Sequence, residues 1–234
     1  MAGKLYLIPT PIDMEAIAES IPVSVQQLIA RLAHFIVEHP KTARQFLKRL
    51  NHQQPLQSIT MLTLNEHTAQ KDLPALLEPL LAGYDVGLMS EAGCPGVADP
   101  GAALVRLAHL HGVNVIPLVG PSSIVLALMA SGLNGQCFAF HGYLPIEHTA
   151  RARKIAELEK FSIELQQTQI FIEAPYRNQK LLEQLMLVCR DTTELCIASQ
   201  LTSTHEKVAT KSISKWRDSL PDINKIPTIF LLQG

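Results

Sequence analysis

Residues 90–101 constrain the fold of this chain more than any other stretch, because they must form a rigid loop between a strand and a helix. They read Ser-Glu-Ala-Gly-Cys-Pro-Gly-Val-Ala-Asp-Pro-Gly and follow the apolar run Val86–Met89. Three glycines and two prolines within these twelve residues exclude regular structure, since glycine permits positive φ and proline fixes φ and removes a donor. Asp99 before Pro100 predicts the N-cap of a helix just beyond this segment, which we call the central loop.

The position of the central loop favours a ligand site. Ligands of parallel α/β sheets bind at loops on the carboxyl ends of strands, and most such loops have only about 2–6 residues. The loop carries neither Gly-x-x-x-x-Gly-Lys-Ser/Thr nor Gly-x-Gly-x-x-Gly, so a triphosphate or a dinucleotide is not favoured. The alternative interpretation is a tightly turned connection without a ligand.

Strands and helices alternate along the first half of the chain. Such alternation predicts a parallel, doubly wound α/β sheet. The apolar runs predict strands at residues 4–8, 34–37, 59–64, 84–89 and 113–116, and the helical spacings predict helices at residues 23–32, 40–50, 72–81 and 102–111.

The second half predicts a mixed sheet, because the apolar run at residues 208–213 is expected to pair antiparallel with the run at residues 194–198 across a polar connection. We therefore expect two α/β domains, residues 1–118 and 119–234. The predicted strands lie at residues 137–140, 168–172, 194–198, 208–213 and 228–232, with helices at residues 121–131, from residue 151 and around residues 181–188.

Composition narrows the functional classes. The net charge is −1 and 47% of the residues are apolar, so the chain is not a strongly basic nucleic-acid binder and any such contact must be local. No apolar run approaches the roughly 18 residues of a membrane span, and no signal-peptide pattern opens the chain, which favours a cytoplasmic protein.

The four cysteines, Cys94, Cys137, Cys189 and Cys196, form no metal-binding pair. Cys137, Cys189 and Cys196 are expected to be buried. Cys94 lies in the central loop, but the sequence places no base beside it to activate it as a nucleophile.

Loops rich in glycine and proline follow or adjoin strands at Pro9, Ala92, Gly120 and Gly142. If the strand ends of both halves converge, these loops line one cleft suited to a flat, uncharged ring.

The motifs at these loops resemble a known family. Pro9-Thr-Pro-Ile12, the central loop, residues 117–123 and His141-Gly-Tyr-Leu-Pro145 together are similar, in the same order, to the bacterial small-subunit ribosomal RNA cytidine-2′-O-methyltransferases of the tetrapyrrole methylase (class III) superfamily. The resemblance implies an S-adenosylmethionine-dependent methyltransferase, usually a homodimer, with the cofactor in a cleft between two α/β domains. The cofactor positions that it implies are Pro9, Ala92, Gly93, Cys94, Val97, Ser122, Ser123, Glu173 and Leu201.

This chain departs from the family pattern where the substrate would be contacted. Val37-Glu-His-Pro-Lys41 replaces Ala-Glu-Asp-Thr-Arg, Glu91 replaces an aspartate, and Ser199-Gln-Leu-Thr-Ser203 replaces Arg-Glu-Leu-Thr-Lys. A ribose hydroxyl is a weak acid, and its methylation benefits from a positioned base. The candidate catalytic bases are Glu38, Glu66 and Glu173, each at a predicted strand end; a structural or cofactor-contacting carboxylate is the alternative for each.

Three functions remain open from the sequence. The first is methylation of ribosomal RNA, the second is a catalytically degenerate paralogue that binds S-adenosylmethionine as a regulator, and the third is methylation of a tetrapyrrole or another small metabolite. A basic strip on the folded surface would favour RNA as the partner. Its candidates are Lys41, Arg44, Lys48, Arg151 and Arg153.

Overall fold

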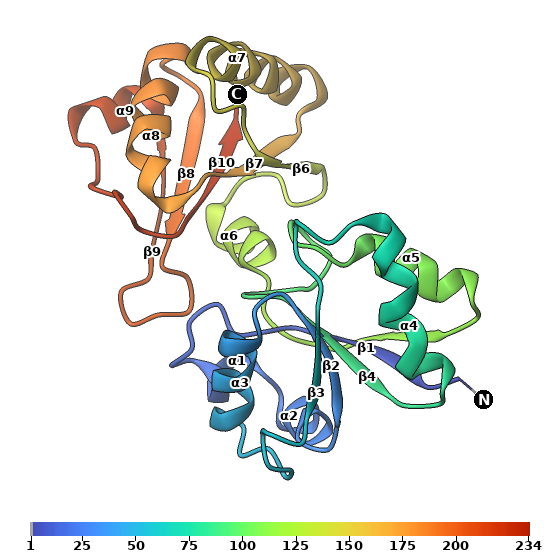
Figure 1. The fold of residues 1–234 in the computed structure, drawn as a ribbon. Helices are drawn as coiled ribbons and strands as arrows, with labels where there is room; N and C mark the ends of the chain where they lie inside the picture. The colour runs from blue at the N-terminus through green and yellow to red at the C-terminus, as the bar shows by residue number, and fades with distance from the viewer. Residues whose placement is uncertain (1) are drawn as a thin grey trace. The chain divides into compact units, whose positions relative to one another are not determined.

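A computed structural model of the chain describes residues 2–234. It divides into two compact units (Figure 1), of which unit 1 ends at Ser122 and unit 2 runs from Ser123 to Gly234. Each unit is built on its own β-sheet.

Unit 1 contains a five-stranded sheet in the order β3-β2-β4-β1-β5. Every strand pair in it is parallel, which confirms the predicted parallel sheet. All five carboxyl ends therefore lie along one edge. The strands are β1 (Lys4–Ile8), β2 (His34–Val37), β3 (Thr60–Thr63), β4 (Val86–Met89) and β5 (Asn114–Pro117).

Helices cover both faces of this sheet, because successive strand residues point to opposite faces. Phe35 of β2 packs in the cluster that holds α2 and α3, whereas the next residue, Ile36, packs in the cluster that holds α4 and α5. This is the doubly wound arrangement that the alternation predicted. The helices are α1 (Ile17–Ser20), α2 (Val23–Ile29), α3 (Pro40–Arg49), the 3₁₀ turn η1 (Gln70–Asp72), α4 (Leu73–Leu81) and α5 (Ala102–Leu110).

Helix α5 begins at Ala102 as predicted, but the predicted cap was wrong. Gly101, not Asp99, is the N-cap residue, and its φ of 140° turns the chain into the helix. Glycine adopts this φ without the steric cost that a side chain would bring. The Asp99 side chain instead hydrogen-bonds with Ser90 at the start of the central loop.

Unit 2 contains a five-stranded mixed sheet in the order β6-β7-β10-β8-β9. Strands β6 and β7 are parallel, and the other neighbouring pairs are antiparallel, which confirms the mixed sheet. The strands are β6 (Phe138–Tyr143), β7 (Thr168–Ile172), β8 (Glu194–Ser199), β9 (Lys207–Ser212) and β10 (Thr228–Gln233).

Two of these strands differ from the prediction. Strand β6 continues to Tyr143 with a register shift after Phe140, so part of the glycine-proline loop predicted at Gly142 is strand. Strand β9 stops at Ser212 because the Ser212 side chain accepts a hydrogen bond from the Lys215 amide and caps α9. Cys189 and Cys196 are buried as expected, whereas Cys137, just before the edge strand β6, is half-buried.

One helix covers one face of this sheet and three cover the other. Helix α6 (Ser123–Ser131) packs through Ala127 and Leu128. On the opposite face Phe171 and Phe230 stack with their ring centroids 5.9 Å apart beneath α7 (His148–Leu165), α8 (Asn178–Val188) and α9 (Ile213–Asp218), and the short turn η2 (Pro175–Arg177) precedes α8. Within residues 2–234, no helix has both the length and the apolar character that crossing a membrane requires.

Candidate functional site

The residues that the sequence singled out in unit 1 gather at the carboxyl edge of its sheet. The sheet order places the residues after β3 and β2, including Glu66 and Glu38, on one side of the central loop. It places Pro9, after β1, and the segment after β5 on the other side. The central loop follows β4, so it lies between an acidic side and a side rich in glycine and proline.

Backbone hydrogen bonds tie the loop after β1 to the central loop. The Thr10 amide donates to the Gly93 carbonyl at 2.9 Å, and the Gly93 amide donates to the Thr10 carbonyl at 3.0 Å. The buried Thr10 hydroxyl donates to the Ser90 carbonyl at 3.2 Å. Gly93 has a φ of 75°, a conformation that most side chains disfavour. The two loops thus hold one another in a fixed shape.

The segment after β5 packs against the same pair of loops. A Cβ on Gly120 would lie 2.4 Å from the Pro9 Cβ atom, so only glycine permits this approach. The Cys94 thiol donates to the Pro121 carbonyl at 3.4 Å. Burial raises the pKa of the Cys94 thiol, which keeps it protonated and leaves it a poor nucleophile.

Carboxylates crowd the other side of the central loop. The Glu38 Oε2 atom is buried and has no hydrogen-bond partner among residues 2–234. Burial raises the pKa of the Glu38 carboxyl, Glu91 and Glu66 raise it further, and His39 lowers it. His39 Nδ1 lies 3.6 Å from Glu91 Oε1. Glu66 itself faces solvent, with 82% of its side chain exposed.

Asp99 belongs to the same group of acids. Burial, together with the charges of Glu38 and Glu91, raises the pKa of its carboxyl to about 6, although the hydrogen bond with Ser90 lowers it. Sequence reasoning missed this role because it assigned Asp99 to helix capping. The available signal was that acidic residues follow three neighbouring strands and that Asp99 ends the loop between them.

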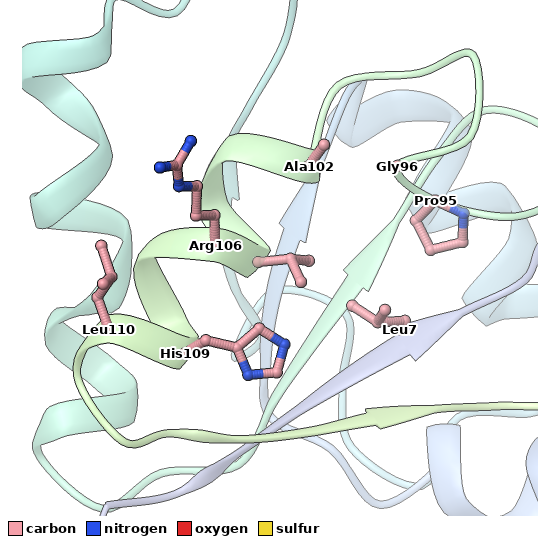
Figure 2. Close-up of a pocket in the computed structure, with 8 residues that line it drawn as sticks. Leu7, Pro95, Gly96, Ala102, Arg106, His109 and Leu110 are labelled. Carbon is pink, nitrogen blue, oxygen red and sulfur yellow. The ribbon is translucent and has the colours of Figure 1, made fainter.

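A pocket of about 540 Å³ opens beside the central loop in unit 1 (Figure 2). Leu7 of β1 and Pro95 of the loop line one side, and α5 lines the other, with Arg106 pointing away from Leu7. Sequence reasoning missed this pocket because it treated α5 only as the helix that follows the loop.

The cofactor positions predicted in unit 2, Glu173 and Leu201, also lie at one edge of its sheet. Glu173 follows Ile172 of β7, and Ile172 pairs with both Tyr143 of β6 and Ile229 of β10. Leu201 follows β8, whose last residue pairs with Thr228 next to Ile229. The ends of β6, β7 and β8 therefore meet at one edge.

Buried polar atoms without partners lie at this edge. The Glu173 side chain is fully buried, and its Oε1 atom accepts from Arg177 Nη2 at 2.5 Å and from the Ala174 amide at 2.8 Å. Its Oε2 atom and the Thr202 hydroxyl have no hydrogen-bond partner among the described residues. Leu201 packs its side chain into the core against α6, so only its main chain is placed to meet a ligand. Ser123, at the start of α6, is partly buried.

The predicted basic strip was wrong at one position. Arg151 is only 6% exposed and donates from Nε to the Gln184 side chain, so it is a packing residue of α7 and α8. The amino end of α7 is capped by Glu147, whose pKa is lowered by hydrogen bonds from the Thr149 and Ala150 amides. Arg153 is exposed on α7, and Lys41, Arg44 and Lys48 are exposed on α3.

Comparison with known proteins decides the family. A family model described as Tetrapyrrole (Corrin/Porphyrin) Methylases matches residues 4–216. The chain belongs to the tetrapyrrole methylases. The resemblance read from the loop motifs is thereby confirmed, and the protein is a methyltransferase.

Curated relatives of this tetrapyrrole methylase share one name. Ribosomal RNA small subunit methyltransferase I of Vibrio cholerae is 33% identical over 207 residues, which span 88% of this chain and 68% of that protein. The protein of the same name from Haemophilus influenzae is 28% identical over 237 residues, which span 100% of this chain and 80% of the relative.

Solved structures of other tetrapyrrole methylases have a similar fold. The methyltransferase CobJ matches with a TM-score of 0.66 at 17% identity, covering 100% of this chain and 95% of its own. The cobalt precorrin-4 methyltransferase CbiF matches with a TM-score of 0.61 at 14% identity, covering 98% and 94%. At these identities the similarity shows the fold alone.

The raised pKa of Asp99 predicts a pH-dependent effect of Asp99→Asn on stability. The pKa is higher in the folded than in the unfolded chain, so ionisation of Asp99 costs folding free energy above about pH 6 and nothing below the unfolded-state pKa of about 4. Because solvent screens part of this electrostatic effect, Asp99→Asn is expected to be more stable than wild type by about 1 kcal/mol at pH 8. The difference is expected to vanish at pH 4.

Urea unfolding of both proteins across this pH range measures the difference. Asp72→Asn is the matched control, since Asp72 is exposed, and it is expected to change stability little at either pH. A lower stability of Asp99→Asn at pH 8 would show that the ionised carboxylate stabilises the fold.

Proposed function

We propose that this tetrapyrrole methylase uses S-adenosylmethionine to methylate a ribose hydroxyl of small-subunit ribosomal RNA. The observation that carries the proposal is the 33% identity, across 88% of the chain, to a protein named Ribosomal RNA small subunit methyltransferase I. The tied loops at the carboxyl edge of unit 1 support it, because methyl transfer is an in-line displacement that depends mainly on positioning.

The residues present fit the proposed cofactor. The Glu173 Oε2 atom and the Thr202 hydroxyl are buried polar atoms without partners, and buried polar groups are normally hydrogen-bonded. A nucleoside with ribose hydroxyls and an amino group supplies the missing partners. In unit 1, a Cβ on Gly93 would approach only the Pro121 carbonyl, at 3.8 Å, so the main chain there is open to a ligand.

The residues proposed to hold the cofactor are those implied by the family resemblance. When bound, S-adenosylmethionine supplies an electrophilic methyl group on a positive sulfur. Main-chain carbonyls of the rigid loops suit a positive sulfur, and main-chain amides suit an adenine edge. The proposed set is Pro9, Ala92, Gly93, Cys94, Val97 and Ser122 in unit 1, and Ser123, Glu173 and Leu201 in unit 2.

An RNA partner is supported by the exposed face of α3. Lys41, Arg44 and Lys48 lie there at successive turns, and none of them takes part in an ion pair of residues 2–234. Arg49 is different, since it pairs with Glu15 at 2.7 Å. Unpaired surface cations can neutralise phosphates and release counterions.

We also propose that the enzyme is a cytoplasmic homodimer. A ribosomal RNA substrate places it in the cytoplasm, and the family resemblance implies a dimer. Apolar side chains that are largely exposed support an association, because such side chains gain free energy when a partner covers them. Leu110 on α5 and Met129 on α6 are 74% and 75% exposed.

The direct test combines cofactor binding with methyl transfer. We expect calorimetry to show stoichiometric binding of S-adenosylmethionine to the full chain. We also expect transfer of a labelled methyl group to small ribosomal subunits from cells that lack the gene, and not to subunits from cells that have it. Mapping by mass spectrometry is expected to place the methyl group on a ribose.

Two other outcomes would contradict the proposal. Cofactor binding without transfer to any subunit or RNA would indicate a regulatory paralogue. Transfer only to a tetrapyrrole or another small metabolite would indicate that the enzyme is a methyltransferase with a different substrate.

Removing the charges of α3 is expected to weaken RNA binding. The triple variant Lys41→Ala, Arg44→Ala and Lys48→Ala should lower affinity at low salt and reduce the slope of log affinity against log salt by about 3, one for each lost phosphate contact. Filter binding over a salt series measures this. A triple alanine variant at the exposed Lys71, Lys180 and Lys215 is the control; equal slopes for both triples would exclude α3 from the RNA interface.

A further inference from the structure

We propose that Tyr143, Tyr176 and Arg177 of unit 2 form a stacking surface for an unpaired base of the RNA segment that the enzyme methylates. This inference rests on the proposed function and adds how the substrate is held beside the cofactor. It arises from two exposed tyrosines in different segments that both adjoin Glu173, a residue of the proposed cofactor set.

The sheet register brings these side chains to the same edge of unit 2. Tyr143 is the last residue of the edge strand β6, and it pairs with Ile172, the last residue of β7. Glu173 follows Ile172, and the turn η2, which contains Tyr176 and Arg177, begins two residues further on. The backbone therefore places one tyrosine beside Glu173 on the neighbouring strand and the other just beyond it along the chain.

The Arg177 guanidinium is held between Glu173 and Tyr176. Its Nη2 atom donates to Glu173 Oε1 at 2.5 Å, and its Nη1 atom donates to Tyr176 Oη at 3.2 Å. The Glu173 side chain is fully buried, so the core anchors the guanidinium. The Arg177 Cζ atom lies 5.2 Å from the centroid of the Tyr176 ring, which is within the range of a cation–π contact.

Tyr143 belongs to the same group of side chains. The hydrogen bond with Glu173 raises the pKa of the Arg177 guanidinium, and burial lowers it. Electrostatic interactions with Glu173 and with both tyrosines raise it further, so the Tyr143 phenol lies near the guanidinium as well. One anchored cation thus connects the two aromatic side chains.

Both tyrosines face solvent. Tyr143 is 59% exposed and Tyr176 is 63% exposed. Single exposed aromatic side chains are common, but two of them beside one anchored guanidinium have the composition of a single-strand binding surface. Proteins that bind single-stranded RNA stack its bases on aromatic rings and on arginine planes. The chemistry of this surface therefore matches a nucleobase.

Glu173 connects this surface to the methyl donor. Its Oε2 atom is buried and has no hydrogen-bond partner among residues 2–234, and the cofactor is proposed to supply one. Methyl transfer requires the ribose oxygen to contact the methyl carbon, so the RNA must pass close to the cofactor. Tyr143 and Tyr176 lie where a base near the reacting ribose can stack.

Such a surface selects an unpaired base. In an A-form helix, neighbouring base pairs cover both faces of each base, and proteins recognise double-stranded RNA mainly through its shape, phosphates and ribose hydroxyls. The rings of Tyr143 and Tyr176 reach the face of a base only after that base has left the stack. Stacking on tyrosine then offsets part of the cost of unstacking.

The binding experiment uses an RNA fragment that spans the methylated nucleotide and the full chain with S-adenosylhomocysteine bound. Tyr143→Leu and Tyr176→Leu are each expected to weaken binding about 5-fold to 150-fold, because leucine lacks a ring face. Tyr143→Phe and Tyr176→Phe keep that face and should stay within about threefold of wild type. Tyr84→Leu is the matched control, since Tyr84 is 55% exposed and precedes β4, at the far end of that strand from the central loop.

Photo-cross-linking gives a readout that a merely structural role would not move. In separate fragments, 5-iodouridine replaces the methylated nucleotide or one of its neighbours, because a halogenated base cross-links efficiently to an aromatic ring on which it stacks. Mass spectrometry of the irradiated complex is expected to identify Tyr143 or Tyr176 as the cross-linked residue. The same RNA annealed to its complement should compete poorly for binding.

Single-turnover methyl transfer to small ribosomal subunits from cells that lack the gene links the surface to the reaction. Tyr143→Leu and Tyr176→Leu are expected to raise the subunit concentration at half-maximal rate by the same factor as in fragment binding. Cofactor affinity by calorimetry should equal that of wild type, which shows that Glu173 and Arg177 remain paired.

The outcomes separate this inference from the proposed function. Absence of transfer by wild type would overturn both. With transfer intact, leucine variants that bind RNA like wild type, equal losses in the leucine and phenylalanine variants, or duplex binding as tight as single-strand binding would each overturn the stacking surface alone. Weaker transfer to subunits with unchanged binding of the RNA fragment would show that this surface meets a ribosomal protein, and would also overturn it.

Discussion

The pair of backbone hydrogen bonds between Thr10 and Gly93 is the constraint on which the candidate site of unit 1 depends. It joins two loops that are more than eighty residues apart in the sequence, and Gly93 makes it with a positive φ, which glycine adopts without steric cost. The approach of Gly120 to Pro9 adds the segment after β5 to the same assembly. Because these contacts involve mainly backbone, the shape tolerates many side-chain changes elsewhere in the loops.

This constraint separates the roles of the two sides of the sheet edge. The side rich in glycine and proline presents main chain and suits a neutral nucleoside. The acidic side holds Glu38, Glu91 and Asp99; burial raises the pKa of the Glu38 and Asp99 carboxyls, and the charges of neighbouring carboxylates raise it further. Such crowding costs stability, and natural proteins keep costly groups of this kind mainly at functional sites. The central loop links the two sides of the sheet edge.

The sequence predicted the architecture well and the individual side chains less well. Alternating apolar runs such as Phe35 and Ile36 identify a strand with two covered faces, and the loop motifs identified the family. The side-chain partner of Asp99 could not be predicted, because capping and bonding back to Ser90 are both local options and the positive φ of Gly101 decides between them. The burial of Arg151 depends on Gln184, which lies thirty-three residues further along the chain.

The central claim is that the tied loops of unit 1 form the platform for the cofactor, and hydrogen–deuterium exchange of the full chain with and without S-adenosylmethionine tests it most directly. The account predicts slower exchange at the amides of residues 10–13, 90–99 and 118–123, with little change on the outer helices α3 and α4. Saturating cofactor that leaves exchange at these three segments unchanged, or that protects only residues elsewhere in the chain, would contradict it.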